Sequence, residues 1–256
     1  MPSAVQLIVG GGLAGLVIGL TGMGGGALLT PMLVLLFKVD PLTAVSSDLV
    51  VSLAIKPLGA AVHRRHGTID RRIVIWLCTG SIPAAFLAAA ALDWFDADSV
   101  QTSLKPALGG ALVVAATAML LKPLLARRRE APDVIAAHRP AVLVAIGLVG
   151  GTVVGLTSVG SGSLMIVLLM WTYPHLTGPQ LVGTDLAQAI PLVGSATVAH
   201  MIFGHVSAPL VGWLVVGAMP GVLAGSLMSS RAPERVIRPI LIVVLVASGL
   251  KLLKAI

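Results

Sequence analysis

The chain has 256 residues, of which 57% are hydrophobic and 11% charged, and its formal net charge is +7. A soluble protein of this length cannot bury so much apolar surface, and several apolar runs are long enough to cross a bilayer, so we expect a polytopic membrane protein. The basic residues cluster in short loops, which is typical of cytoplasmic loops in membrane proteins and does not indicate nucleic-acid binding.

The first apolar segment, residues 4–37, is too long for one membrane span and too short for two. As a continuous helix it would be roughly 50 Å long, against a bilayer core of about 30 Å. Glycines crowd positions 22–26, and each costs about 1 kcal/mol inside a helix relative to alanine. The sequence therefore predicts a helix over 5–20, a glycine break at membrane depth and a half-length helix over 27–37.

A half-helix that begins inside a membrane directs its unpaired N–H groups and the positive end of its dipole into the protein, which is typical of an anion site. Packing is the alternative reading of membrane glycines, because small residues let helices approach closely. We favour packing for Gly15 and Gly19, which are four residues apart. For positions 22–26 we favour the break.

Three full spans follow in the first half of the chain. They lie at about residues 44–62, 73–92 and 104–121. A basic stretch that contains Arg127, Arg128 and Arg129 separates them from the second half. The predicted organisation is a first membrane repeat at 1–121, a basic cytoplasmic linker at 122–139 and a second membrane repeat at 140–256.

The second half of the chain repeats the first. The run from Val17 to Thr21 recurs as the run from Val153 to Thr157. Further along, at a spacing one residue longer, paired residues match in the two halves: Asp48 with Asp185, His63 with His200, Gly67 with Gly204, Trp76 with Trp213, and Pro83 with Pro220. Internal repeats with glycine-interrupted segments at equivalent positions indicate a transporter site.

Loop charges indicate the orientation of the two halves. If the first segment of each half turns back, each half crosses an odd number of times and the halves are inverted. The basic loops at 63–72, 127–129 and 231–238 then all face the cytoplasm, as the positive-inside rule requires, and the loop with Asp93 faces out. A single crossing by each first segment is the alternative, and Lys251 and Lys254 argue weakly for it. The predicted fold is all-α, with two inverted repeats, each of a broken or re-entrant segment plus three spans, giving eight hydrophobic segments and up to ten helices.

The chain resembles the TauE/SafE sulfite exporter family over nearly its whole length. The resemblance rests on the glycines at 22–26 and on two sets of residues, Ser47, Asp48, Leu49, Lys56, His63, Gly67 and Asp70 in the first half, and Gly183, Thr184, Asp185, Leu186, His200 and Gly204 in the second. The family pattern usually has Gly-Thr-Asp in both halves, whereas Ser46 and Ser47 precede Asp48 here, and Ser207 stands where the first half has Asp70. The resemblance implies export of sulfite or small organosulfur anions.

Lys56 is the most informative candidate, because a lysine deep within a span costs roughly 3 kcal/mol on insertion and should face a cavity or partner. It would serve as a counter-charge for an anion, or alternatively extend to the membrane surface. Asp48 and Asp185 are candidates for proton or ion coupling, or alternatively N-caps of their helices. Gln188 can donate to an oxyanion or to a neighbouring helix. We expect His63 and His200 to lie at the membrane interface.

The repeat predicts a second break at 158–163, and the expected substrate site lies where the two half-helices begin, at Ala27 and Leu164. Its candidate residues are Thr21, Gly22, Gly24, Gly25, Gly26, Ser47, Lys56, Thr157, Ser158, Gly160, Ser161, Gly162, Ser163, Thr184 and Gln188. No catalytic constellation, metal-ligand spacing or cofactor motif occurs, so we expect neither an enzyme nor a bound metal or cofactor. Besides the lipid bilayer, a small anion is the expected partner.

The leading hypothesis is a secondary transporter of the inner (plasma) membrane that exports sulfite or related oxyanions. One elementary charge crossing 100 mV is worth about 2.3 kcal/mol, so an interior-negative potential drives an anion outward without a coupling ion. An anion channel, or proton- or sodium-coupled uptake, would use the same features. A non-transporting assembly factor is a third class, which the broken helices and Lys56 disfavour.

Overall fold

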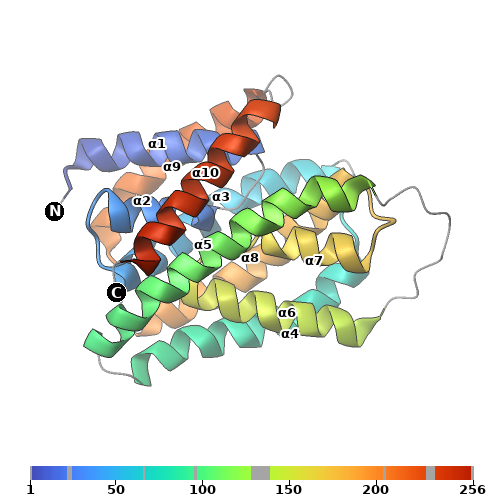
Figure 1. Ribbon diagram of the computed structural model, residues 1–256, viewed down its shortest axis with the longest axis horizontal. Helices are drawn as coiled ribbons and strands as arrows, with labels where there is room; N and C mark the ends of the chain where they lie inside the picture. Colours follow the sequence, from blue (N-terminus) through green and yellow to red (C-terminus); the bar gives the residue numbers. More distant parts are fainter. Residues whose placement is uncertain are drawn as a thin grey trace.

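The computed structural model describes residues 2–21, 25–65, 67–94, 97–127, 139–203, 206–228 and 234–254. Within these residues the chain forms ten α-helices and no strand (Figure 1). Their bounds are α1 Ala4–Thr21, α2 Leu29–Leu35, α3 Pro41–Arg65, α4 Arg71–Ala91, α5 Ala97–Arg127, α6 Pro140–Thr157, α7 Leu164–Thr172, α8 Gly178–Ile202, α9 Ala208–Met228 and α10 Glu234–Leu253. Short 3-10 turns, η1 at Gly25–Ala27 and η2 at Leu92–Trp94, complete the described elements.

Seven of the described helices are long and apolar enough to cross a membrane, namely α1, α3, α4, α5, α6, α8 and α9. The prediction of an all-α, polytopic membrane protein is therefore confirmed. Helices α2 and α7 are about half as long and follow the two predicted breaks. Helix α5 continues to Arg127, so the first residues of the predicted linker are helical, and positions 128–138 lie outside the described residues.

Polar side chains fix where helices α4 and α8 begin. The Asp70 carboxylate accepts hydrogen bonds from the N–H groups of Arg72 and Ile73 and caps α4. At α8, Thr177 and Gln180 form a reciprocal capping box. Caps of this kind satisfy N–H groups that a helix leaves unpaired, typically stabilising it by about 1 kcal/mol.

The first helix of each half packs against a helix of the other half. Helix α1 packs along α9 and, in the equivalent pairing, α6 packs along α4. A Cβ atom on Gly11 would lie 2.7 Å from the Leu214 carbonyl oxygen, and one on Gly15 would overlap the Ala218 backbone. In the other pair, Gly147 and Gly151 abut the backbones of Leu77 and Ser81 in the same way. The predicted packing role of Gly15 is confirmed, and Gly19 does the same against Val222.

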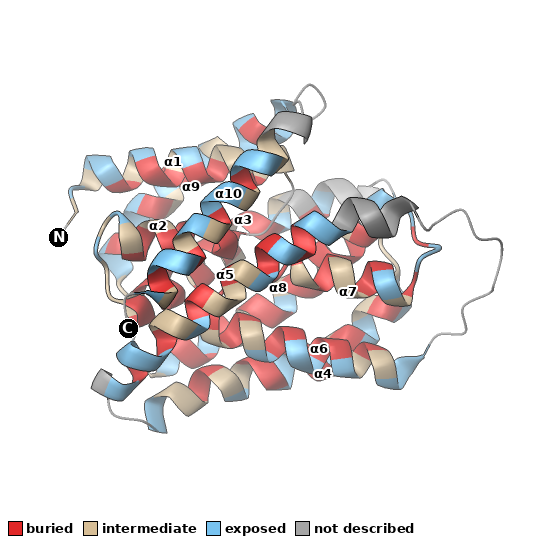
Figure 2. Cartoon of the chain, in the orientation of Figure 1, coloured by how far each residue is buried: buried red, intermediate tan, exposed pale blue. Residues whose placement is uncertain are grey.

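Helices α3 and α8, which occupy equivalent places in the two halves, pack against each other at the centre of the protein. They have the largest buried share of the seven candidate spans. In Figure 2 the outer helices α1 and α10 show much exposed surface, while buried residues dominate the interior. This places the polar residues of α3 and α8 away from lipid.

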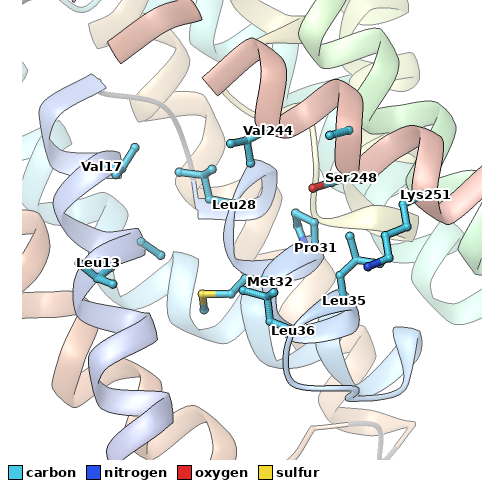
Figure 3. Close-up of a pocket in the computed structure, with 12 residues that line it drawn as sticks. Leu13, Val17, Leu28, Pro31, Met32, Leu35, Leu36, Val244, Ser248 and Lys251 are labelled. Carbon is cyan, nitrogen blue, oxygen red and sulfur yellow. The ribbon is translucent and has the colours of Figure 1, made fainter. Parts of the chain in front are cut away.

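One pairing is not shared by the two halves. Helix α5 packs against α7, whereas the equivalent helices, α10 and α2, have a groove between them. The groove has a volume of about 440 Å³ and is lined by α1, α2 and α10 together with Leu28 and Leu36, which flank α2 (Figure 3). The two halves therefore share their helix order but differ in how closely the last helix approaches the half-helix of the other repeat.

Candidate functional site

The second predicted break is an unwound segment between α6 and α7. Helix α6 ends at Thr157, and Ser158 follows with φ of 58°, in the left-handed region. Gly160 and Gly162 have φ of 110° and 126°, which side-chain-bearing residues rarely adopt. The glycines thus permit the chain to turn before α7 begins at Leu164.

The first break has the same place in its half. Helix α1 ends at Thr21, and the 3-10 turn η1 at Gly25–Ala27 leads into α2. Gly22 and Gly24, two of the predicted site residues, lie outside the described residues. The interruption of the first apolar segment is confirmed.

The two breaks touch each other inside the protein. Gly26 lies so close to Ser158 that a Cβ atom on the glycine would overlap the serine carbonyl group. A Cβ atom on Gly25 would lie 2.7 Å from Ser52 Oγ and 3.3 Å from Asp48 Oδ1. The glycines of the first break therefore allow the backbone to approach both the second break and the polar side chains of α3.

Lys56 joins the two halves at this point. Its side chain is only 3% exposed, and Nζ donates a hydrogen bond of 3.0 Å to Ser161 Oγ in the second break. This geometry contradicts the alternative in which the lysine extends to the membrane surface. Asp48 and Asp185 are near enough to act on the lysine charge, yet no salt bridge to Lys56 is found among the described residues.

Asp48 is held by hydroxyl groups. Thr30 Oγ1 donates to Asp48 Oδ2 at 2.6 Å, and Ser52 Oγ donates to Oδ1 at 3.3 Å. The residue lies well inside α3, which begins at Pro41, so the N-cap alternative is wrong for Asp48. Through Thr30, the carboxylate connects α3 with α2, and it stabilises the half-helix in its position.

Asp185 has a different environment, although it is the repeat partner of Asp48. It is 2% exposed and lies well inside α8, whose N-cap is Thr177, so the N-cap alternative is wrong here as well. Among the described residues, no group donates a hydrogen bond to Asp185 Oδ1. A buried carboxylate oxygen without a donor costs free energy unless a proton, a cation or a buried cationic group compensates.

Gln188 lies one turn after Asp185 and is also buried. Its Nε2 donates to Ser81 Oγ on α4 at 2.8 Å, and its Oε1 has no donor in the described part of the chain. The predicted contact to a neighbouring helix is therefore present. Thr184 also makes a contact between the two halves, because its Oγ1 accepts a hydrogen bond from the Asp70 backbone N–H at 3.0 Å.

The remaining predicted residues surround this cluster. Thr21 and Thr157 donate to the carbonyls of Val17 and Val153, one turn back in their own helices. Ser163 is buried at the start of α7 but makes no capping hydrogen bond. Ser47 and Ser158 are buried; the described residues provide no hydrogen-bond partner for the Ser47 hydroxyl, whereas the Ser158 hydroxyl lies beside the Asp48 carboxylate.

His200 was expected at the membrane interface, but it is 1% exposed and lies inside the protein. Its Nδ1 is 2.8 Å from Ser46 Oγ on α3, and its Nε2 is 3.1 Å from the Gly155 carbonyl oxygen on α6. Sequence reasoning missed Ser46 as the partner of His200, because the two residues are far apart in the chain. The side chain of His63, its repeat partner, lies outside the described part of the structure.

These features define a polytopic membrane protein built from two interlocked halves, with a buried polar centre where two broken helices meet. The family model described as "Sulfite exporter TauE/SafE" matches residues 7–252. The chain belongs to the TauE/SafE sulfite exporter family, which places it among membrane transporters.

Three proteins of Bacillus subtilis are similar to it over most of their length. The chain is 38% identical to "Probable membrane transporter protein YjnA", with 98% of this chain and all of that protein covered. It is 24% identical to "Probable membrane transporter protein YdhB" (94% and 96% covered) and 26% identical to "Probable membrane transporter protein YunE" (98% and 97% covered). No solved structure matches the chain. A multi-pass protein with bacterial relatives of this kind belongs to the plasma membrane.

Proposed function

We propose that the protein is a secondary transporter that exports sulfite or a related small oxyanion through the buried centre described above. The observation that carries the proposal is Lys56, a buried lysine whose ammonium group bonds a neutral hydroxyl in the opposite break. A buried cation costs several kcal/mol unless partners compensate for it. Asp48 and Asp185 act on this charge without a salt bridge among the described residues, and an oxyanion beside Ser161 would add a direct partner while it is bound.

The surroundings of Lys56 support the same ligand. Ser158 Oγ and the start of α7 lie in the same break, and a helix N-terminus favours negative charge. The family and its description support a sulfur oxyanion as the substrate. The interior-negative membrane potential drives an anion outward, which supports export over uptake.

We also propose that the two halves are inverted with respect to each other in the membrane. In Figure 1, α1 begins at the left end of the protein, whereas α6 begins toward the right end, so equivalent helices start from opposite sides. The reciprocal packing of α1 on α9 and of α6 on α4 supports a two-fold relation. The mid-membrane site would then lie between the halves, as in other inverted-repeat transporters.

Flux measurements on the purified protein in lipid vesicles test the proposal. Lys56→Ala should lower sulfite export at least about thirtyfold, because removing one partner of a buried charged contact costs roughly 2 to 5 kcal/mol. Lys56→Arg should remain partly active, since it keeps the charge but changes its shape. Lys105→Ala, at a partly buried lysine of α5, is the matched control. Full export by a folded Lys56→Ala protein would contradict the proposal.

The same vesicles distinguish a carrier from a channel. A carrier that alternates between two states should saturate and should exchange labelled substrate against unlabelled substrate on the other side. A channel should do neither at the same concentrations. We expect saturation and exchange, because the two breaks are in contact and the polar centre is closed by packed residues.

A further inference from the structure

We propose that the groove between α1, α2 and α10 binds one acyl chain of an anionic phospholipid, whose phosphate group lies beside the ammonium group of Lys251. The groove is formed by apolar side chains from all three helices, and Leu13 and Leu36 at its rim are exposed. In a protein that spans the bilayer, such a rim faces the hydrocarbon core. An acyl chain is the apolar group that is present there at high concentration.

The end of the groove identifies the headgroup. Lys251 lies in the last turn of α10, lines the groove, and directs its ammonium group toward Leu35 (Figure 3). Ser248, one turn earlier, also lines the groove. Among the described residues no carboxylate forms a salt bridge with Lys251. A lysine near the end of a membrane helix attracts anionic lipid, so the charge of the site complements a phosphate group.

The groove is present in only one of the two equivalent places among the described residues. At the equivalent place in the other half, α5 packs directly against α7. A lipid chain between α2 and α10 would fill the space that direct helix contact fills there. A lipid bound in the α2–α10 groove would therefore contact both helices and replace the direct contact that α5 and α7 make.

The proposal is tested by native mass spectrometry and thermal unfolding of the purified full-length protein in detergent. The probes are phosphatidylglycerol, which is anionic, and phosphatidylcholine, which is zwitterionic. We expect one phosphatidylglycerol molecule to remain bound and to raise the unfolding temperature more than phosphatidylcholine does. Lys251→Gln should weaken phosphatidylglycerol binding about fivefold, equivalent to about 1 kcal/mol for one basic residue near an anionic surface.

Matched variants separate the groove from the general surface. Lys254→Gln removes an exposed lysine that does not line the groove and should leave binding unchanged. Ala247→Phe should fill the groove and abolish the bound lipid, whereas Val243→Phe, at an exposed position outside the groove, should not. Equal binding of both lipids, unchanged binding by Ala247→Phe, or a dimer that Ala247→Phe disrupts would overturn the proposal. In the last case a second copy of the chain would be the occupant.

Discussion

At the scale of single residues, the two repeat-related aspartates have diverged. Asp48 accepts hydrogen bonds from Thr30 and Ser52, while Asp185 Oδ1 has no donor among the described residues. The position equivalent to Ser52 in the second half is Ala189, which has no hydroxyl to donate. One carboxylate is therefore held by two hydroxyl donors, whereas an oxygen of the other has no donor in the described part of the chain.

Thr30→Val should destabilise the protein. The substitution removes the hydroxyl that donates to Asp48 and leaves a buried carboxylate oxygen without that donor, which costs about 1 to 3 kcal/mol. Thermal unfolding in detergent measures the effect. Thr152→Val is the control, because that hydroxyl only donates to Leu148 within its own helix. Equal unfolding temperatures for the two variants would argue against a structural role for Asp48.

Asp185→Asn should remove any response of transport to an imposed proton or sodium gradient. The amide cannot bind a proton as the carboxylate does, and it lacks the charge that attracts a cation. Transport into vesicles, measured with and without each gradient, reports the change. Asp48→Asn should lower stability but keep the response, and a response that survives in Asp185→Asn would assign coupling elsewhere.

At the scale of elements, glycine determines how closely helices approach and where they break. Gly15 and Gly151 touch backbone atoms of α9 and α4, respectively, and Gly160 and Gly162 adopt positive φ. The first role needs a helical glycine without a side chain, whereas the second needs a conformation that other residues rarely adopt. Packing was predicted for Gly15 from its spacing to Gly19, but was not predicted for Gly151. The break was predicted from segment length in the first half and from the repeat in the second.

Gly15→Ala should separate α1 from α9 and cost about 1 to 3 kcal/mol, as overpacking typically does. Gly151→Ala should have a comparable cost at the α6–α4 contact. Gly12→Ala is the control in the same helix, because its added Cβ atom would lie 3.6 Å from the Gly217 carbonyl oxygen, an ordinary contact. Unfolding temperatures of the three variants test whether the loss of stability follows the closeness of the added Cβ atom. An equal loss for Gly12→Ala and Gly15→Ala would contradict this.

The sequence predicted the helices and the two breaks, because hydropathy, length and glycine content act locally. Lys56 and both aspartates were candidates because charged residues within spans are rare, and their part in transport stays a prediction. It could not predict that Lys56 bonds Ser161, that Thr30 bonds Asp48, or that His200 is buried against Ser46. Those contacts depend on how helices from opposite halves pack, and no pattern within one segment encodes that.

At the scale of the whole molecule, loop charge and the proposed inversion predict on which side of the membrane each loop lies. Single cysteines at Arg128 and Ser230, in a Cys78→Ala background, should both react with a membrane-impermeant reagent from the cytoplasmic side. A cysteine at Asp93 should react only from outside. The basic loops near the first two positions account for this arrangement. Labelling of Arg128 and Ser230 from opposite sides would mean parallel halves.

The unequal pairing of α5 with α7 and of α10 with α2 has a consequence for motion. The chain contains two equivalent versions of one contact, one closed and one open. With the halves inverted, exchanging the two versions would bring α10 onto α2 and release α7 from α5, which moves the open position to the opposite membrane face. The two packings would then be the end states of a rocking cycle, and a lipid between α2 and α10 would act as a wedge that favours one of them.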